Sequence, residues 1–290
     1  MAARLLEGQP VADAVLGEVK LRVAALQQRG RSVALGTILV GDDPASAGYV
    51  RKKHETCARV GLVSHRIDLL ADSTQADLLD AVDRFNDDPQ VDAFLIQHPV
   101  PAGLHFNQAM LRMRPDKDAD GLHPINLGKL VLQEPGPIPA TPAGIRAMLQ
   151  HFALEIAGRE VVIIGRGPTL GRPLSLLLSA KQTGGNAVVT VVHSAVENLT
   201  AYTQRADIVI ACAGQPDIVT RDMVKPGAIA ISAGISWSGK KLVPDVSEQV
   251  GEIASWITPR IGGVGVTTVA MLLRNTVALA EARESSGHTL

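Results

Sequence analysis

The stretch EVVIIGRGPTLGRPLSLLL, residues 160–178, determines the fold class that the rest of the sequence has to fit. It reads as a short apolar strand, a glycine-bearing turn and then a helix. Gly165 and Gly167 would permit a tight turn and a close approach to a phosphate, and Gly171 would let the helix start near the sheet. The helix N-terminus would then offer backbone N–H groups and a positive dipole end to a pyrophosphate.

The spacing of these glycines, G-x-G-x-x-x-G, is one residue longer than the usual dinucleotide fingerprint. On spacing alone, a glycine turn in an ordinary α/β domain explains the pattern as well. The position between a strand and a helix favours a dinucleotide site. The next predicted strand ends with His193 and Ser194 and has no acid, while Arg166 and Arg172 lie in the loop. An NAD site usually has an acid there for the ribose 2′-OH, so the pattern favours a 2′-phosphate and therefore NADP.

On both sides of this stretch, segments rich in Val, Ile and Ala alternate with helical patterns. This alternation is typical of an α/β fold with a largely parallel sheet. A segment with four prolines, QEPGPIPATP at 133–142, predicts a connection between domains. Thr141 and Pro142 then predict an N-cap and a first helical position. Buried strands are predicted at 33–41, 91–100, 160–165, 187–194, 206–214 and 227–235, and helices at 1–23, around Tyr49 and after 262–265.

The composition excludes several classes of protein. A length of 290 residues suits about two domains. The 28 basic residues nearly balance the 29 acidic ones, so neither a nucleic-acid footprint nor a membrane-surface patch is indicated. No apolar run approaches the length of a membrane span, and the start lacks the features of a signal peptide. We expect a cytoplasmic protein without a metal site, in which Cys57 and Cys212 are reduced.

The acidic run DKDADGLHPINL, residues 116–127, begins like a calcium-binding loop. The twelfth position is Leu127, where such a loop requires a bidentate glutamate, so calcium is not expected. Two interpretations remain open: a loop in which Asp120 faces a ligand, or a solvated turn with caps.

Tyr49 and Lys53 are four residues apart in YVRKKHETCARVG, which begins at residue 49. On a helix this spacing places a flat ring and an amine on the same face, one turn apart. The pair indicates either a working site or a basic surface helix with a stray aromatic residue.

Seven motifs, taken in order, resemble one known family. They are YVRKKHETCARVG, QHPVP, DKDADGLHPINLGKL, TPAGI, GRGPTLGRP, AGQPDIV and TPRIGGVGVTTVAMLL. The set resembles the bifunctional methylenetetrahydrofolate dehydrogenase/methenyltetrahydrofolate cyclohydrolase (FolD) family over nearly the whole chain. The resemblance implies an α/β fold with two domains around a cleft. A folate-binding catalytic domain of residues 1–138 and 267–290, completed by the C-terminal helix, would accompany a Rossmann-type NADP-binding domain of residues 139–266.

The resemblance also implies an activity and roles by position. A homodimer would oxidise 5,10-methylenetetrahydrofolate with NADP and hydrolyse the methenyl product to 10-formyltetrahydrofolate. Tyr49 would stack on the folate, Lys53 would be the catalytic amine, Gln97 would hydrogen-bond that amine and the substrate, and Asp120 would hold the pterin ring. Further matching positions are Gly262 and Gly263 for the substrate, and Gly165, Arg166, Gly167, Gly171, His193, Ser194 and Ile235 for the cofactor. Arg166 and Ser194 match the positions that meet the 2′-phosphate.

A lysine can move the proton of the hydrolysis if its pKa is lowered toward neutrality. Burial would lower it, and we expect the neighbouring cations Arg51 and Lys52 to act in the same direction. Gln97, an amide, can orient the amine without stabilising its charge as a carboxylate would.

The sequence departs from the family pattern at five positions. His98 follows Gln97, where it could titrate near the lysine or pack into the strand end. Ser232 and Ser236 replace an acid and an asparagine, and Ile261 and Val266 replace two prolines of the loop that closes over folate. Losing prolines should make that loop more mobile and weaken substrate binding. A monofunctional dehydrogenase and a non-catalytic binding protein are the alternatives, and retention of Lys53 with Gln97 weighs against the former.

Overall fold

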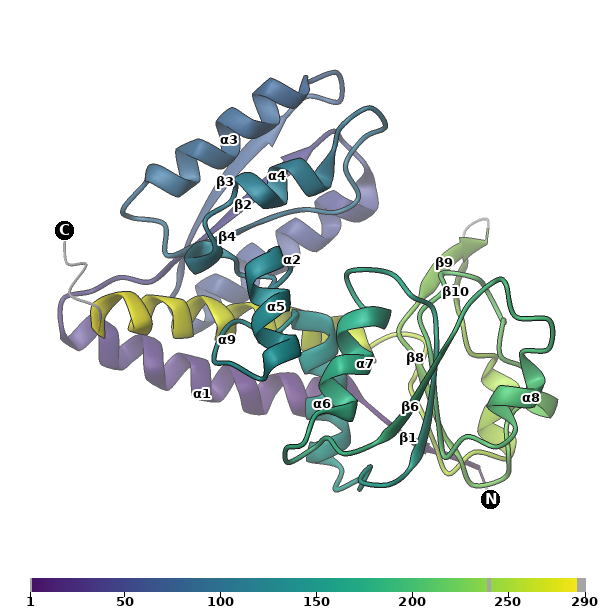
Figure 1. The fold of residues 1–290 in the computed structure, drawn as a ribbon. Helices are drawn as coiled ribbons and strands as arrows, with labels where there is room; N and C mark the ends of the chain where they lie inside the picture. The colour runs from purple at the N-terminus through teal and green to yellow at the C-terminus, as the bar shows by residue number, and fades with distance from the viewer. Residues whose placement is uncertain (1, 239–240, 286–290) are drawn as a thin grey trace. The chain divides into compact units, whose positions relative to one another are not determined.

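The computed structural model of the chain describes residues 2–238 and 241–285, and it divides into two compact units (Figure 1). Unit 1 takes the chain up to Ala12 together with Thr141–Thr268. Unit 2 takes Asp13–Ala140 together with the chain from Val269 onward. Each unit contains a parallel sheet and helices, which confirms the predicted α/β fold with two domains. The predicted domain limits, after residues 138 and 266, remain a prediction.

The principal helices and the strands have the following bounds. The helices are α1 (Gly8–Gln28), α2 (Pro44–Val60), α3 (Gln75–Asp87), α4 (Phe106–Arg112), α5 (Pro124–Leu132), α6 (Ala140–His151), α7 (Gly171–Ser179), α8 (Thr200–Thr203) and α9 (Val264–Ser285). The strands are β1 (Arg4–Leu5), β2 (Ala34–Val40), β3 (Val63–Leu69), β4 (Ala93–Ile96), β5 (Glu160–Ile164), β6 (Val188–Val192), β7 (Ile208–Ala211), β8 (Ile229–Ser232), β9 (Ile235–Ser238), β10 (Lys241–Pro244) and β11 (Trp256–Ile257).

Unit 2 is built on a three-stranded parallel sheet with the order β3-β2-β4. The central strand β2 is buried along its whole length, as its continuous apolar sequence predicts. Phe94 of β4 and Phe85 of α3 pack with their ring centroids 5.4 Å apart in the core. The long helices α1 and α9 lie side by side (Figure 1), and the Arg22 guanidinium of α1 donates to Glu281 of α9 at 2.6 Å. The C-terminal helix therefore packs as part of unit 2.

Unit 1 is built on a six-stranded parallel sheet with the order β1-β11-β8-β7-β5-β6. From β5 the chain continues to β6 on one side and to β7 and β8 on the other, so the strand order reverses between β5 and β7. This is the topology of a Rossmann-type dinucleotide-binding sheet, with its switch point at the carboxyl ends of those two strands. The strands β9 and β10 form a separate antiparallel pair.

Four local predictions were wrong. The first helix begins at Gly8, because residues 4–5 pair with β11, some 250 residues away, and carry no local signal. The strand β6 is only partly buried because it lies at the sheet edge: Val192 is buried, but Val188 is 56% exposed. The strand β4 ends at Ile96, and α6 begins at Ala140, so Thr141 lies inside the helix rather than at its cap.

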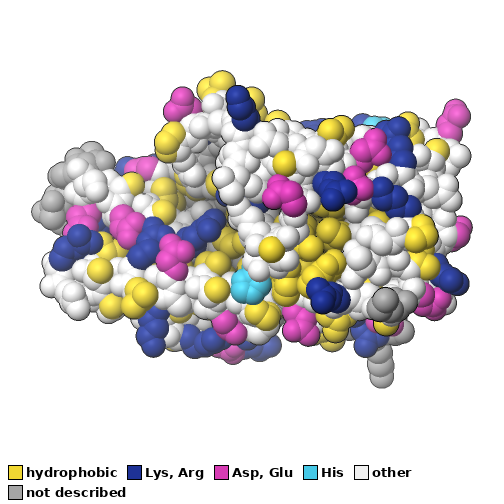
Figure 2. Space-filling model, turned by 90° about the horizontal axis from the view of Figure 1, so that it is seen from below, with side chains coloured by type: hydrophobic (Ala, Val, Ile, Leu, Met, Phe, Trp, Pro, Cys, Tyr) yellow, Lys and Arg dark blue, Asp and Glu magenta, His cyan; other side chains and the backbone are white. Residues whose placement is uncertain are grey.

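The surface of the described residues carries both signs of charge. On the face drawn in Figure 2, Lys and Arg side chains are interspersed with Asp and Glu, in line with the balance of 28 basic and 29 acidic residues. None of the helices among the described residues is both long enough and apolar enough to cross a membrane.

Candidate active site

The buried amine of Lys53 lies on α2, one turn after Tyr49. The helix starts where the sequence places its signals: the Asp43 carboxylate accepts from Ser46 N at 2.8 Å, and Pro44 occupies the first turn. Lys53 is only 7% exposed, whereas Tyr49 keeps 49% of its surface exposed. The helix therefore presents an accessible aromatic ring next to an amine that is shielded from water.

Gln97, at the end of β4, fixes the orientation of that amine. Its Nε2 donates to the His98 carbonyl at 2.8 Å, which turns Oε1 toward Lys53, and Lys53 Nζ donates to Oε1 at 3.0 Å. The His98 imidazole itself packs edge-on against Phe106, with centroids 5.1 Å apart. Apart from this contact His98 is exposed, and it is not among the groups that shift the pKa of Lys53.

The groups that shift the pKa of Lys53 are not all those that were predicted. Burial lowers the pKa of Lys53, and the negative charge of Asp120 opposes this by raising it. Arg51 and Lys52 are exposed on α2 and do not contribute, which corrects the expectation that they help to lower the pKa. Burial raises the pKa of Asp120, while Lys53 pulls it down. The amine and the carboxyl are thus electrostatic neighbours whose pKa values burial moves toward each other.

The three aspartates of the acidic run have three different environments. Asp116 is half-exposed and pairs with the Arg114 guanidinium at 2.6 Å. Asp118 is fully buried, and its carboxylate accepts from Gly121 N at 2.9 Å, His123 N at 2.7 Å and the Asn126 amide at 2.9 Å. Asp120 accepts no side-chain hydrogen bond from any described residue. The run is therefore a capped turn, but Lys117, Asp118 and Ala119 are buried, so the interpretation as a solvated turn was wrong. That Asp120 faces a ligand stays a prediction.

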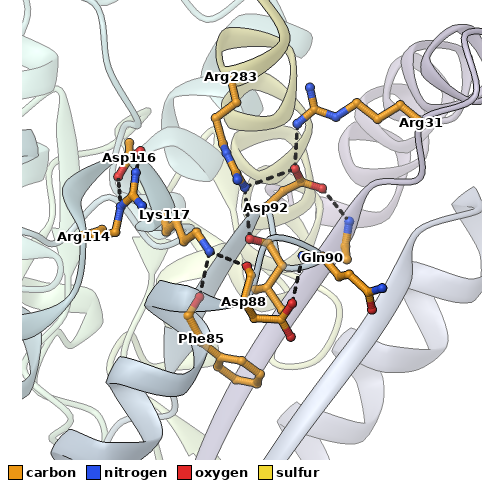
Figure 3. Close-up of polar contacts among 11 residues, drawn as sticks. Arg31, Phe85, Asp88, Gln90, Asp92, Arg114, Asp116, Lys117 and Arg283 are labelled. Carbon is orange, nitrogen blue, oxygen red and sulfur yellow. Dashed lines mark hydrogen bonds and ion pairs between the residues drawn. The ribbon is translucent and has the colours of Figure 1, made fainter. Parts of the chain in front are cut away.

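The segment that leads to Asp120 is anchored by a buried lysine (Figure 3). Lys117 Nζ donates to the carbonyls of Phe85 and Asp88, at 2.8 and 2.6 Å, at the C-terminal end of α3. Burial lowers the pKa of Lys117 to about 8. On the other side, the Asn275 amide of α9 donates to the Ala119 carbonyl at 3.0 Å. These contacts hold the backbone just before Asp120, and the hydrogen bond from Gly121 N to Asp118 holds it just after. A ligand group needs such support to be positioned.

In unit 1 the glycine loop has the features that a dinucleotide needs. Gly165 has φ of +127°, and a Cβ at Gly171 would lie 2.2 Å from the Gly165 carbonyl oxygen, so α7 can begin against the loop only because residue 171 is glycine. No side chain caps the N-terminus of α7, and a Cβ at Gly167 would meet nothing within 4 Å. The amides of the helix start and the open space above the loop fit a pyrophosphate.

The remaining predicted positions of unit 1 surround the carboxyl ends of its strands. The register pairs Ile164 of β5 with Val192 of β6. His193 and Ser194 therefore follow β6 at the same edge of the sheet at which the glycine loop follows β5. Gly262 has φ of +84° and, with Gly263, precedes α9. The backbone of Ile235 pairs with Pro244, while its side chain lies outside the described part of the structure. No carboxylate stands at the end of β6, which fits a 2′-phosphate.

Comparison with known proteins identifies the family. The catalytic domain of tetrahydrofolate dehydrogenase/cyclohydrolase matches residues 6–120, and the NAD(P)-binding domain of the same family matches residues 139–284. The chain belongs to this family. It is 65% identical to the bifunctional protein FolD of Syntrophotalea carbinolica over 283 residues, covering 98% of each chain.

Solved structures agree with this family assignment. The bifunctional FolD of Campylobacter jejuni superimposes with a TM-score of 0.92 at 37% identity, covering 97% of this chain and 100% of the other. The FolD of Trypanosoma brucei, solved with NADP and an inhibitor, gives a TM-score of 0.92 at 34% identity over 98% and 99% of the chains. This member of the family is a bifunctional, NADP-linked methylenetetrahydrofolate dehydrogenase and methenyltetrahydrofolate cyclohydrolase.

Tyr49, Lys53, Gln97 and Asp120 all belong to unit 2, where Lys53 contacts Gln97 and interacts electrostatically with Asp120. The predicted cofactor residues belong to unit 1, and so do Gly262 and Gly263, which were predicted for the substrate. Sequence reasoning missed the residues that hold this FolD site in place: Lys117, Asp118 and Asn275 in unit 2. Their partners are backbone groups brought close only by the fold, so spacing along the chain gives no signal for them. The sequence offered one indication of them: the carboxylates of three closely spaced acids would repel one another if all three faced the same ligand.

Proposed function

We propose that the two reactions of this FolD enzyme depend on separate residues, with Lys53 as the proton carrier of the cyclohydrolase. The observation that carries the proposal is the buried Lys53 amine held by Gln97 Oε1 at 3.0 Å. When water attacks the methenyl carbon, the neutral amine accepts a proton from that water. It can then return the proton to the folate nitrogen as the carbon–nitrogen bond breaks.

In the same proposal, the other three groups of unit 2 bind and orient the folate. The exposed ring of Tyr49 offers a flat platform, which places the one-carbon bridge. Asp120 has a carboxylate free to accept hydrogen bonds from the pterin ring, and Gln97 reaches both the amine and the substrate. Gly262 and Gly263 would approach the substrate through their backbone.

For the cofactor, we propose that the amides after Gly165 hold the pyrophosphate of NADP and that Arg166 and Ser194 meet its 2′-phosphate. His193 and Ile235 would contact the same cofactor. NADP supplies a hydride acceptor, and the protein's contribution is to bind and orient it. An Arg166→Ala variant should therefore bind NADP more weakly while its weak affinity for NAD is unchanged.

We further propose that the enzyme is a cytoplasmic homodimer with domain limits at residues 138/139 and 266/267. Family resemblance supports this part of the proposal. Light scattering on purified protein tests it, because a mass twice the chain mass of 30.5 kDa is expected and a mass equal to it would refute the dimer.

The proposal for Lys53 is tested by substituting two adjacent lysines of α2. Lys53→Gln should lower the cyclohydrolase rate by about a hundredfold or more, because the proton carrier is lost. Lys52→Gln, in which an exposed lysine of the same helix is changed, is the matched control and should keep the wild-type rate. Equal rates in the two variants would refute the assignment of Lys53.

A further inference from the structure

The turn that follows β7 in unit 1 lies at the switch point of the sheet. Ile164 at the end of β5 pairs with Ala211 at the end of β7, and the strand order reverses between these two strands. Ligands of such sheets bind outside the carboxyl ends of the strands at this point. The backbone of Ala213 and Gly214 therefore borders the place where the cofactor has to lie.

A buried carboxylate holds this turn through its backbone N–H groups. Asp245 is fully buried, and its Oδ2 accepts from Ala213 N at 2.7 Å and from Gly214 N at 2.9 Å. Burial raises the pKa of Asp245, while the backbone amides of residues 213–215 pull it down. A Cβ at Gly234 would lie 2.0 Å from Oδ2, so the space for the carboxylate exists only because residue 234 is glycine.

The two serines that depart from the family pattern belong to the same arrangement. Ser232 Oγ donates to the Gly234 carbonyl at 2.9 Å and accepts from Asp245 N at 2.9 Å, which fixes the backbone of Asp245. Ser236 Oγ donates to the Gly214 carbonyl at 2.8 Å. Asp245 thus holds the N–H groups of the turn, and Ser236 holds its carbonyl. Both serines that replace family residues therefore form hydrogen bonds that hold this arrangement in place.

We propose that Asp245, supported by Ser236, is a positioning residue that sets the place of the nicotinamide half of NADP through the turn Ala213–Gly214. This inference rests on the proposed function, in which the 2′-phosphate lies at the end of β6, on one side of the glycine loop. In the strand order of the sheet, the other half of the dinucleotide would then extend toward β7 and β8. Asp245 is buried and acts through the turn, without touching the ligand itself.

The proposal is tested by calorimetry with two probes, NADP and 2′,5′-ADP, the second of which lacks the nicotinamide half. Asp245→Ala should weaken NADP binding about tenfold, because two amides lose a charged acceptor, and leave 2′,5′-ADP binding within twofold of wild type. Ser236→Ala should act in the same direction, about threefold. Ser255→Ala is the matched control, because Ser255 donates to the Ala228 carbonyl at the opposite end of β8, and both affinities should be unchanged.

The affinity for 2′,5′-ADP monitors the folding of unit 1, which contains Asp245. The hydrolysis of added methenyltetrahydrofolate monitors unit 2 independently of NADP, since the proposed proton carrier lies there. It should stay within twofold of wild type in Asp245→Ala. If Asp245→Ala misfolds, Ser236→Ala tests the proposal in its place, because this substitution leaves the buried carboxylate unchanged. An equal loss of affinity for both probes in Ser236→Ala, or no loss for either, would overturn the proposal.

Discussion

At the scale of single residues, the acidic run at 116–120 shows that three identical side chains can have different environments. Asp116 pairs at the surface, Asp118 holds a turn together, and the Asp120 carboxylate accepts no hydrogen bond from the described residues. The sequence singled out Asp120 as the acid that faces a ligand, and this role stays a prediction. Its pattern could not separate Asp118 from Asp116, because the distinguishing partners of Asp118 are backbone amides whose positions depend on the folded turn.

Asp118→Ala should destabilise the protein by about 3 kcal/mol, because two buried amides lose their acceptor. Asp116→Ala removes a half-exposed ion pair and should cost less than about 1 kcal/mol. Urea unfolding of the two variants measures the difference. Equal stabilities would mean that the buried turn contributes no more than the surface pair.

The pH dependence of the cyclohydrolase should follow Lys53. The neutral amine is the active form, so the rate should rise with pH as Lys53 loses its proton and then level off. The charge of Asp120 raises the pKa of Lys53, so Asp120→Asn should shift this rise to lower pH. Profiles of kcat/KM, corrected for spontaneous hydrolysis, measure the shift. A profile that stays in place or moves to higher pH contradicts the assignment.

At the scale of elements, prediction succeeded where local pattern and burial agree. The strand β2, the helix α2 and the strand–turn–helix at 160–178 all carry their signals within the segment. The strand β3 was missed because, as an edge strand, it contains polar residues such as His65 and Asp68 and therefore lacks a continuous apolar run. The pairing of β1 with β11 joins residues near opposite ends of the chain, so no local sequence pattern predicts it.

The start of α1 has a consequence for the loop that precedes α9. Gly8 N donates to the Gly262 carbonyl at 2.8 Å, and a Cβ at Gly8 would lie 2.0 Å from the Gly263 carbonyl oxygen and 2.7 Å from Val266 Cγ2. The N-terminal segment therefore packs against the loop that contains Ile261, whereas Val266, expected in the same loop, lies in the first turn of α9.

Gly8→Ala should displace this loop and raise the KM for methylenetetrahydrofolate about tenfold or more. Gly17→Ala, a glycine in the exposed part of the same helix with nothing within 4 Å of its Cβ position, is the control. It should leave the KM unchanged and raise stability by about 1 kcal/mol, because alanine favours the helix. Steady-state kinetics with thermal unfolding separates the two effects. An unchanged KM in Gly8→Ala would show that the loop does not depend on this contact.

At the scale of the whole molecule, the residues proposed for the two reactions are divided between the two units of the chain. Unit 2 carries the buried amine, Tyr49, Gln97 and Asp120, and unit 1 carries the glycine loop, the cofactor groups and Gly262 with Gly263. Because each unit has its own sheet and core, a substitution at an exposed or ligand-facing position in one should leave the structure of the other intact.

The most direct test of this claim is a set of four initial rates in which Lys53→Gln and Arg166→Ala are each assayed for both reactions. We expect Lys53→Gln to lose the hydrolysis of added methenyltetrahydrofolate and to keep oxidation of methylenetetrahydrofolate within about tenfold of wild type. Arg166→Ala should do the reverse at low NADP concentrations. If each variant lost both activities to the same extent, the two reactions would not be separable by residue, and the account would be wrong.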